Sequence, residues 1–565
     1  MEKWGSYDGR GLTLGDQIED WPRSPKAKIE QMPSLQWIGK DKVVNHHHDV
    51  PFKPLVHQYQ FTTDGHDEKN GSTNKIIHGD NLEALKALLP EFESRVNCIY
   101  IDPPYNTGND TWVYNDNCDD PRIANWLGKT VGKIGEDLTR DDKWLCMMWP
   151  RLKMLHRLLS KNGAIFISID DGEGHYLRQC VEEIFGKANF VANIIWQRRT
   201  SPDARVDLGA AHDYILVFAK DIRKCKFKRL LDDEAKVSSY RNLDNDERGP
   251  WASTDYTAQG FRPNQMYRIT TPSGAEYSPP PGRCWANVEP VFKKMLMDNR
   301  VWFGVDGNSR PRIKAFQSEA DGRRAWTWWS NKEVGHNQEA KKEILSIMGS
   351  ENIFDTPKPV RLISRIIHLA TSPGDIILDS FAGSGTTAHA TLLKNAEDDG
   401  GRRFILVEMM DYAETITAER VRRVMTGYGL GNKAVGGLRG SFDFYTIGEG
   451  SLFDEDGGLD PRFPIVSMRQ YIAWTEGIPA EAVQPIVNIV HPSWLGTYGD
   501  RAVLFNYDPV QATTLDFAFL ANLSFPSDNK PAQILIYADY CTIDAAFLGK
   551  ARIVFKKIPR DVSRL

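Results

Sequence analysis

Short apolar runs that alternate with helical stretches constrain the fold of this chain more than any other feature. Examples are VNCIYI (96–101) and AIFISI (164–169) in the first part of the chain, and DIILD (375–379) and FILVE (404–408) in the second. Runs of this length, rich in β-branched residues, are typical of parallel strands that are buried on both faces. The sequence therefore predicts an α/β fold with a doubly wound, mostly parallel sheet.

Between residues 198 and 340 this alternation is interrupted by a stretch rich in Arg, Trp, Pro and Gly, although 214–219 reads as one more strand. Such a stretch favours an inserted domain or a set of long loops over a continuation of the sheet. The predicted segments are an irregular N-terminal extension (1–70), a first half of the sheet domain (71–197), the inserted region (198–340), a second half (341–435) and a small, mixed α/β C-terminal accessory domain (436–565).

Composition narrows the class of protein. The chain is 41% hydrophobic and 26% charged, as expected of a folded domain, and its net charge of -5 excludes a wholly basic nucleic-acid coat but not a local basic cleft. No apolar run approaches the roughly 18 residues that a membrane span needs. The first residues do not resemble a signal peptide. We expect a cytoplasmic protein that is not bound to a membrane.

The sequence offers no metal-binding pattern. None of its seven cysteines forms a C-x-x-C pair, which argues against a zinc ribbon. The HHH triplet at 46–48 has no carboxylate or cysteine at ligand spacing, and we interpret it as a solvated loop. Nearby, a helix is expected from Leu82 to Leu89, ended by Pro90.

The first segment that can carry chemistry is DPPYNTG (102–108), directly after VNCIYI. Pro103 and Pro104 fix the backbone and remove two N–H donors, so that the carbonyl groups before and between them can accept hydrogen bonds from a ligand. Asp102 adds a carboxylate, and Tyr105 offers a flat face. This set suits a planar group that bears an NH2. A simple rigid turn is disfavoured by the position at the carboxyl end of a buried strand, where ligands bind in such sheets.

The second segment is DSFAGSGTT (379–387), between the strand DIILD and a helix. Its glycines let a cofactor approach the backbone, and the helix N-terminus presents free N–H groups. No lysine stands in the turn, which argues against an ATP-binding P-loop, and Ala388 in place of a third glycine makes the dinucleotide fingerprint weak. Glu408 ends the next strand, where a carboxylate can accept hydrogen bonds from ribose hydroxyls. A nucleoside-containing cofactor is therefore expected.

DPPY followed far downstream by FAGSG, with an insertion between them, resembles the beta class of amino-methyltransferases, in which the catalytic half precedes the cofactor half. Asp rather than Ser in DPPY is that class's usual mark of adenine N6 over cytosine N4. HGDNLEALKALLP, GAIFISIDD, HDYILVFAK, DNDERGPW and PKPVRLISRII are similar to segments of Mod subunits of type III restriction-modification systems. The resemblance covers about residues 75–565, and standalone or phage-defence methylases share much of it.

The resemblance implies a site-specific DNA methyltransferase that moves a methyl group from S-adenosylmethionine to adenine N6, leaving S-adenosylhomocysteine. Because the amine is paired inside duplex DNA, the base must be flipped out. The catalytic residues that it implies are Asp102, Pro103, Pro104 and Tyr105. The cofactor-binding residues that it implies are Asp379, Phe381, Ala382, Gly383, Gly385 and Glu408, with Asp80 and Lys358 from flanking segments.

The inserted region is expected to recognise the target sequence, because arginines alternate there with tryptophans. Arginine can read guanine edges and can also hold phosphate. The cluster, rather than any single member, is the signal. The candidate DNA-binding residues are Arg198, Arg199, Arg262, Arg283, Arg323 and Arg324.

The expected partners are double-stranded DNA, a second copy of the chain in a homodimer, and an ATP-dependent restriction or helicase subunit. Three other functions stay open. Cytosine N4 methylation uses the same acceptor geometry. A DNA-specificity subunit with a vestigial catalytic site is opposed by the intact DPPY and FAGSG motifs. An RNA or protein amine methyltransferase is the third, although protein glutamine enzymes usually carry Asn where Asp102 stands.

Overall fold

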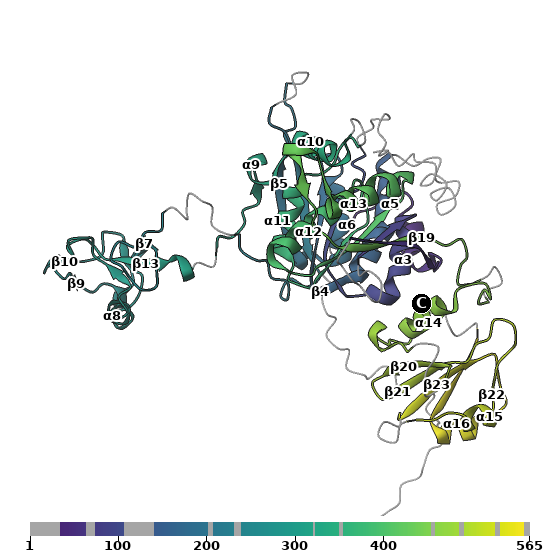
Figure 1. Cartoon of the computed structure of the whole chain (residues 1–565). Helices are drawn as coiled ribbons and strands as arrows, with labels where there is room; N and C mark the ends of the chain where they lie inside the picture. Colours follow the sequence, from purple (N-terminus) through teal and green to yellow (C-terminus); the bar gives the residue numbers. More distant parts are fainter. Residues whose placement is uncertain are drawn as a thin grey trace, which may run out of the picture.

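The structure of the protein is a computed structural model (Figure 1), which describes residues 34–63, 74–106, 140–201, 207–230, 239–319, 322–349, 354–453, 458–484, 491–525 and 531–558. A ten-stranded sheet lies at its centre, with the order β1–β19–β2–β16–β15–β3–β4–β6–β5–β14. These strands are β1 (Leu55–Thr62), β2 (Lys75–His78), β3 (Val96–Ile101), β4 (Leu159–Ile169), β5 (Phe190–Gln197), β6 (His212–Ala219), β14 (Trp328–Trp329), β15 (Ile376–Asp379), β16 (Arg403–Glu408) and β19 (Ser441–Ile447).

Most neighbouring strands of this sheet are parallel. All pairs from β19 to β4 run in the same direction, whereas β6 is antiparallel to β4 and β5, and β1 is antiparallel to β19. The prediction of a mostly parallel sheet is confirmed.

Helices cover both faces of the sheet (Figure 1). The side chains of β3 show the two layers, because Ile99 and Ile101 pack in one core with α3 and α5, whereas Cys98 and Tyr100 pack in another with α11. Burial on both faces explains why the strands are apolar along their whole length. The helices of the two layers are α3 (Asn81–Phe92), α5 (Arg140–Leu158), α6 (Gly174–Phe185), α10 (Asn337–Met348), α11 (Val360–Ala370), α12 (Thr386–Asp398) and α13 (Glu419–Thr426).

The order of the strands reverses between β3 and β15. The chain proceeds from β3 to β4 on one side and from β15 to β16 on the other. The two strands are parallel neighbours, with Leu378 opposite Ile99. Such a reversal leaves a crevice at the carboxyl ends of the two strands, which is where ligands bind in open α/β sheets. Asp102 and Asp379 stand at these ends.

The N-terminal extension is more regular than predicted. In its described part, α1 (Lys40–Val43) and α2 (His46–Asp49) precede β1, which forms an edge of the central sheet by pairing with β19. The prediction of a solvated loop at 46–48 is wrong, because His47 is buried and burial lowers its pKa to about 3. Among the described residues, no three His, Cys, Asp or Glu side chains are grouped as metal ligands.

Two predicted boundaries also differ from the structure. β6 lies between β4 and β5, so the central sheet continues beyond residue 198, and β14 returns to it before residue 340. In α3 the helix continues through Pro90 to Phe92. A proline removes one hydrogen bond, but here this happens in the last turn, where the buried Leu89 and Phe92 hold the helix against the core.

The inserted region folds around a small core of its own, formed by Tyr256, Ile269, Trp285, Phe292, Val301 and Phe303. In Figure 1 this module stands apart from the central sheet. Its elements are β7 (Trp251–Asp255), β8 (Thr257–Gln259), β9 (Ile269–Thr270), β10 (Glu276–Tyr277), β11 (Arg283–Trp285), α8 (Glu289–Met297), β12 (Val301–Trp302) and β13 (Arg312–Phe316).

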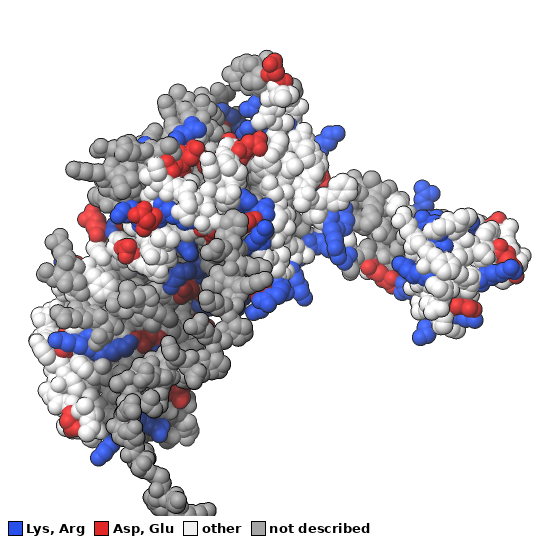
Figure 2. All heavy atoms as spheres, turned by 180° about the vertical axis from the view of Figure 1, so that it is seen from behind, with Lys and Arg blue, Asp and Glu red and all other residues white. Residues whose placement is uncertain are grey.

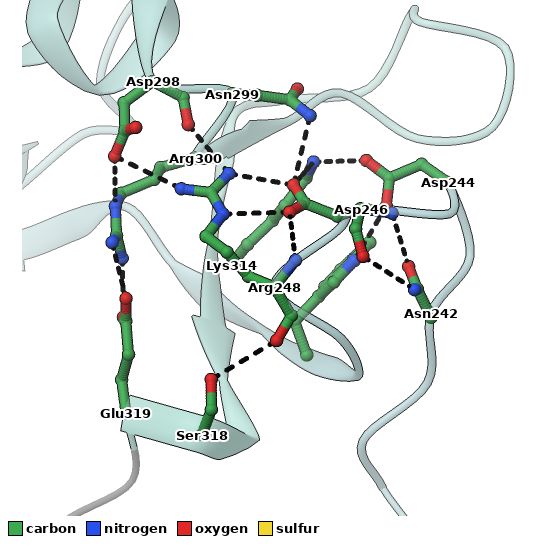
Figure 3. Close-up of polar contacts among 11 residues, drawn as sticks. Asn242, Asp244, Asp246, Arg248, Asp298, Asn299, Arg300, Lys314, Ser318 and Glu319 are labelled. Atoms are coloured by element: carbon green, nitrogen blue, oxygen red, sulfur yellow. Dashed lines mark hydrogen bonds and ion pairs between the residues drawn. The ribbon is translucent and has the colours of Figure 1, made fainter.

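A buried lysine at the centre of a polar network holds the module's first loop (Figure 3). The Lys314 side chain is fully buried on β13, where Nζ pairs with Asp244 and lies 3.4 Å from Asp246 Oδ2. Asp246 also accepts hydrogen bonds from Arg248 Nη2 at 2.8 Å and Asn299 Nδ2 at 3.1 Å. These contacts hold the DNDERGPW segment (244–251) in position, and they explain why so many of its residues are charged.

The C-terminal region begins with α14 (Ile465–Thr475), which packs on α3; Trp474 Nε1 donates to Glu93 Oε2 at 2.5 Å. It continues as a four-stranded sheet in the order β20–β21–β23–β25. No helix in the described ranges is both long and apolar enough to cross a bilayer. The elements are β20 (Trp494–Tyr498), β21 (Arg501–Phe505), β22 (Thr514–Leu515), α15 (Phe517–Ala521), β23 (Gln533–Ala538), β24 (Tyr540–Cys541), α16 (Ala545–Ala551) and β25 (Ile553–Lys557).

Removing the charge of Lys314 should unfold the inserted module selectively. Lys314→Met leaves two aspartates without their buried cation, and breaking a buried ion pair from one side costs about 3–5 kcal/mol. We expect faster hydrogen exchange in β7 and β13 and unchanged exchange in β3 and β15. The control is Lys293→Met, whose partner Glu289 lies on the same exposed helix and whose loss should change stability by less than about 0.5 kcal/mol. Equal exchange in both variants would contradict the role of Lys314.

Candidate active site

A cavity of about 270 Å³ opens at the carboxyl ends of β3 and β15. The two segments singled out in the sequence meet there: Asp102, Pro103 and Tyr105 come from the first, and residues 379, 381–384, 386 and 387 from the second. The rest of its lining comes from other parts of the chain, namely Tyr100 on β3 and Asp170, Arg198, Arg199, Asp213, Asn337, Phe354, Thr356, Pro357 and Lys358.

The DPPY segment presents two acceptors to this cavity. Asp102 follows β3, and its Oδ1 accepts a hydrogen bond from the Tyr105 hydroxyl at 3.0 Å. The Pro104 carbonyl is engaged outside the cavity, because Trp144 Nε1 of α5 donates to it at 2.7 Å. The Pro103 carbonyl accepts no hydrogen bond from any described residue. Asp102 Oδ2 and the Pro103 carbonyl are thus the two acceptors of this segment that neither its own residues nor α5 use.

Lys358 connects the two halves of the site. It lies just before α11, and its Nζ forms an ion pair with Asp102 Oδ2. The same ammonium group lies 5.1 Å from the centre of the Tyr105 ring. Lys358 was predicted to bind a cofactor; the structure places it in the cavity, where its partner is the Asp102 carboxylate.

Two glycines shape the turn between β15 and α12. Gly383 and Gly385 have φ angles of 51° and 77°, in the left-handed region that favours glycine. A Cβ atom at Gly383 would lie 3.1 Å from the Phe354 ring, and one at Gly385 would lie 3.0 Å from the Thr417 carbonyl. The turn can therefore keep this shape only without side chains at these two positions, and Gly383 lines the cavity.

Asp379 anchors the start of the same turn. Its carboxylate accepts hydrogen bonds from the Phe381 amide at 3.0 Å and from the Thr387 hydroxyl at 2.6 Å. Burial raises the pKa of Asp379 to about 7, and the nearby negative charge of Asp102 acts in the same direction. Phe381 and Ala382 follow it into the lining of the cavity.

Glu408 connects the turn to the next strand, β16. Its Oε2 accepts from the Gly383 amide at 2.7 Å, and its Oε1 accepts from the Met410 amide at 2.9 Å. The side chain is buried, and burial raises its pKa to about 7. Glu408 lies behind the cavity wall, one contact away from the cavity through Gly383.

Asp80 caps a helix and is not part of the cavity lining. Its Oδ1 accepts from the Leu82 and Glu83 amides at 2.8 and 3.1 Å, and its Oδ2 pairs with the buried Arg151 at 3.1 Å. The adjacent Asn81 reaches the FAGSG turn, because its Nδ2 donates to the Ser380 carbonyl at 3.3 Å.

The six arginines predicted to bind DNA are placed differently from one another. Arg198 and Arg199 follow β5. They line the cavity and are not part of the inserted module. The Arg198 Nε lies 3.1 Å from Asp213 Oδ1. Asp213 is buried at the start of β6, and burial raises its pKa to about 7. Sequence reasoning missed Asp213, although a carboxylate beside an apolar run (HDYILVFAK) was a usable signal.

The other four arginines lie at or beyond the edge of the sheet. Arg323 pairs with Glu333 at 3.2 Å, and Arg324 beside it is exposed. Within the inserted module, Arg283 Nη2 pairs with Asp255 at 2.9 Å, and Arg262 Nη1 donates to Gln265 Oε1 at 3.2 Å. Arg283 is thereby engaged in an ion pair within its own module.

Residues 96–419, which include both segments, match the DNA methylase family N6_N4_Mtase. The chain is similar to the StyLTI Mod subunit of a type III restriction-modification enzyme of Salmonella typhimurium, with 35% identity over 407 residues, 69% of this chain and 61% of that subunit. It is 29% identical to the EcoPI Mod subunit of Escherichia phage P1 over 476 residues, 76% of this chain and 70% of that subunit. It is 32% identical to the type II methyltransferase M.KpnI of Klebsiella pneumoniae over 379 residues, 63% of this chain and 85% of that enzyme.

The matched part spans less than two thirds of the StyLTI subunit, so the two proteins are not equivalent over their whole length. The family match covers more than half of this chain and contains DPPY, FAGSG and the cavity between them. The resemblance seen in the sequence is confirmed: the chain belongs to the DNA methylase family.

Proposed function

We propose that the protein is a DNA methyltransferase that transfers a methyl group from S-adenosylmethionine to the N6 amine of adenine. The observation that carries this proposal is the convergence of Asp102, Pro103 and Tyr105 with the FAGSG turn on one cavity at the reversal point of the sheet. An acceptor pair for an amine and a glycine-rich cradle for a nucleoside are thus within reach of each other.

The acceptor pair supplies the activation that the reaction needs. An aromatic amine is a poor nucleophile because its lone pair is delocalised into the ring. Hydrogen bonds from its two N–H groups to the Asp102 carboxylate and the Pro103 carbonyl would localise that pair and relieve the positive charge that develops on nitrogen. Tyr105 would stack on the flipped base and hold it in line.

The residues of the second segment fit the cofactor. S-adenosylmethionine, when bound, supplies the methyl group on its sulfonium. Gly383 lines the cavity without a side chain, Thr386 and Thr387 at the start of α12 line it as well, and Glu408 behind the wall holds the Gly383 amide and with it the turn. Phe381 and Ala382 provide apolar lining.

The ion pair between Lys358 and Asp102 has a consequence for the order of events. The target amine must take the place of the ammonium group at Asp102 Oδ2. Two other carboxylates, Asp213 and Asp379, also interact electrostatically with Lys358. Against the effect of burial, the positive charge of Lys358 lowers the pKa of both carboxyls and so favours their charged forms, which can pair with the ammonium group when the base enters.

An exposed basic and aromatic strip at the β14 edge of the central sheet supports DNA as the substrate. Trp326 and Trp328 are 75% and 49% exposed, and Arg324 is exposed next to them. The strip is defined as Arg324, Trp326 and Trp328. Trp328 lies on β14, which pairs with β5, and β5 leads into Arg198 and Arg199 of the cavity lining. Figure 2 shows Lys and Arg side chains on the body near the inserted module and on the module itself.

The inserted module is proposed to recognise the target sequence, and the C-terminal region to serve as an accessory domain. By analogy with the type III Mod relatives, we also propose a homodimer, a partner subunit with ATP-dependent restriction or helicase activity, and action in the cytoplasm. Cytosine N4 methylation is the second candidate function, because it needs the same acceptor pair. Nucleoside analysis of methylated DNA separates the two: N6-methyladenine supports the proposal, and N4-methylcytosine replaces it.

The loss of the Asp102 carboxylate should abolish methyl transfer. Removing one preorganised charge partner of the reacting group costs about 10²–10³-fold in kcat, and we expect at least this loss in Asp102→Ala. The affinity for S-adenosylmethionine, measured by calorimetry, should stay within about threefold, a change of less than 1 kcal/mol. Asp171→Ala, at an exposed carboxylate of the neighbouring loop, is the control. Wild-type turnover in Asp102→Ala would defeat the assignment.

Cofactor affinity should depend on pH through Glu408. Its pKa of about 7 means that the carboxyl is protonated below neutrality, whereas a carboxylate is the better acceptor for the Gly383 and Met410 amides that hold the turn proposed to bind the cofactor. The Kd for S-adenosylmethionine should therefore fall as the pH rises from 6 to 8, by up to about tenfold per unit below the pKa. Glu408→Gln should flatten this dependence. A pH profile that survives in the variant would assign it to another group, such as Asp379.

Truncating the two tryptophans of the strip should weaken DNA binding without changing the affinity for S-adenosylmethionine. Exposed tryptophans at binding surfaces are frequently hot spots whose truncation costs about 1–2 kcal/mol or more, so Trp326→Ala with Trp328→Ala should raise the Kd for target DNA by about tenfold or more. Phe517→Ala, at a 57% exposed aromatic residue of α15, is the control. Unchanged DNA affinity, or a loss that follows a change from dimer to monomer by light scattering, would contradict the proposed DNA contact.

A further inference from the structure

The residue that follows DPPY is held in an unusual conformation. Asn106 has a φ angle of 60°, in the left-handed region that residues other than glycine rarely adopt, and its side chain is buried. It directly follows Tyr105, the residue proposed to stack on the base. The backbone at Asn106 therefore sets the direction of the last part of residues 102–106, which we call the acceptor loop. A strained conformation persists only where its surroundings enforce it.

Two carboxylates enforce it through the amide group of Asn106. Its Nδ2 donates to Glu173 Oε1 at 2.5 Å and to Asp141 Oδ1 at 3.3 Å. Glu173 belongs to the turn between β4 and α6, and Asp141 to the first turn of α5. Three elements that are separate in the sequence thus meet on one side chain at the base of the acceptor loop.

The Glu173 side chain is specialised for this contact. It is only 2% exposed, and its Oε2, like Asn106 Oδ1, has no hydrogen-bond partner among the described residues. Burial raises the pKa of Glu173 to about 7, the negative charge of Asp141 adds to the effect, and the Asn106 amide and the charge of Arg140 oppose it. No described Lys or Arg forms an ion pair with this carboxyl that would offset the cost of burying it, so a surface or packing role does not explain its presence.

We propose that Glu173 is a positioning residue for methyl transfer, which acts through Asn106 to fix the loop that carries Asp102, Pro103 and Tyr105. The inference rests on the proposed function of that loop. Trp144, which binds the Pro104 carbonyl, fixes the middle of the loop, and the Glu173–Asn106 contact fixes its end. Between these two points, the acceptors can keep the geometry that alignment of the amine requires.

The test compares Glu173→Ala with Glu173→Gln in the full-length protein. Glu173→Ala removes the nearer of the two acceptors of the Asn106 amide and leaves only Asp141 at 3.3 Å, and a misplacement of the order of 1 Å costs about 10²-fold in rate. We expect the single-turnover rate to fall by about this factor, with Kd for S-adenosylmethionine and for target DNA within about twofold. Glu173→Gln retains a carbonyl acceptor of the same shape and should restore the rate to within about threefold of wild type.

Asn106→Gly provides a second variant that does not depend on the folding of the first. Glycine adopts the left-handed conformation without strain, so the fold is preserved while the contact is lost. The rate should fall as in Glu173→Ala. Glu182→Ala, which removes a partly exposed glutamate from α6, the helix that follows Glu173, is the matched control and should behave as wild type.

Three outcomes would overturn the inference: a wild-type rate in Glu173→Ala, a wild-type rate in Asn106→Gly, or a Glu173→Gln variant as slow as Glu173→Ala. A loss of cofactor and DNA affinity in parallel with the rate would also overturn it, because that pattern indicates general damage to the fold. A wild-type protein that methylates no DNA would instead reject the proposed function, so the two failures are distinguishable.

Discussion

The parallel pairing of β3 with β15 is the constraint on which the rest of the molecule depends. Leu378 stands opposite Ile99, and because the strands run in the same direction, Asp102 and Asp379 emerge at the same edge of the sheet. Helices cover both faces of this pair, so the strands cannot slip or separate without exposing the core. A site assembled from two distant parts of the chain is thereby as rigid as the sheet itself.

Burial at this edge determines the electrostatic character of the site. The pKa of Asp379, Asp213, Glu408 and Glu173 is raised to about 7 by desolvation, and none of them faces the target amine in the proposed mechanism. The carboxylate that does face it is Asp102, and this one forms an ion pair with Lys358. The four carboxyl groups with raised pKa values thus hold the fold in place, whereas Asp102 can exchange its bond to Lys358 for a bond to a ligand.

The sheet could be predicted from the sequence to the extent that its strands are buried on both faces, because such strands are apolar at every position. β1 could not, since an edge strand with one exposed face reads LVHQYQFT, without an apolar run. The position of β6 between β4 and β5 could not be predicted either, because the order of strands depends on long-range pairing and not on the local sequence pattern. For the same reason the inserted region was predicted to begin too early, at residue 198.

The site was predictable where its residues are contiguous, as in DPPY and FAGSG, and not where it depends on contacts between distant segments. Lys358 with Asp102, Arg198 with Asp213 and Asn106 with Glu173 join residues that share no periodicity. The arginines show the same limit: several that looked available for DNA in the sequence are bound within the inserted module, as are Arg248 and Arg300 in its polar network. Their ion pairs stabilise the shape of the module, so sequence recognition by it would fall to the exposed side chains that this shape presents.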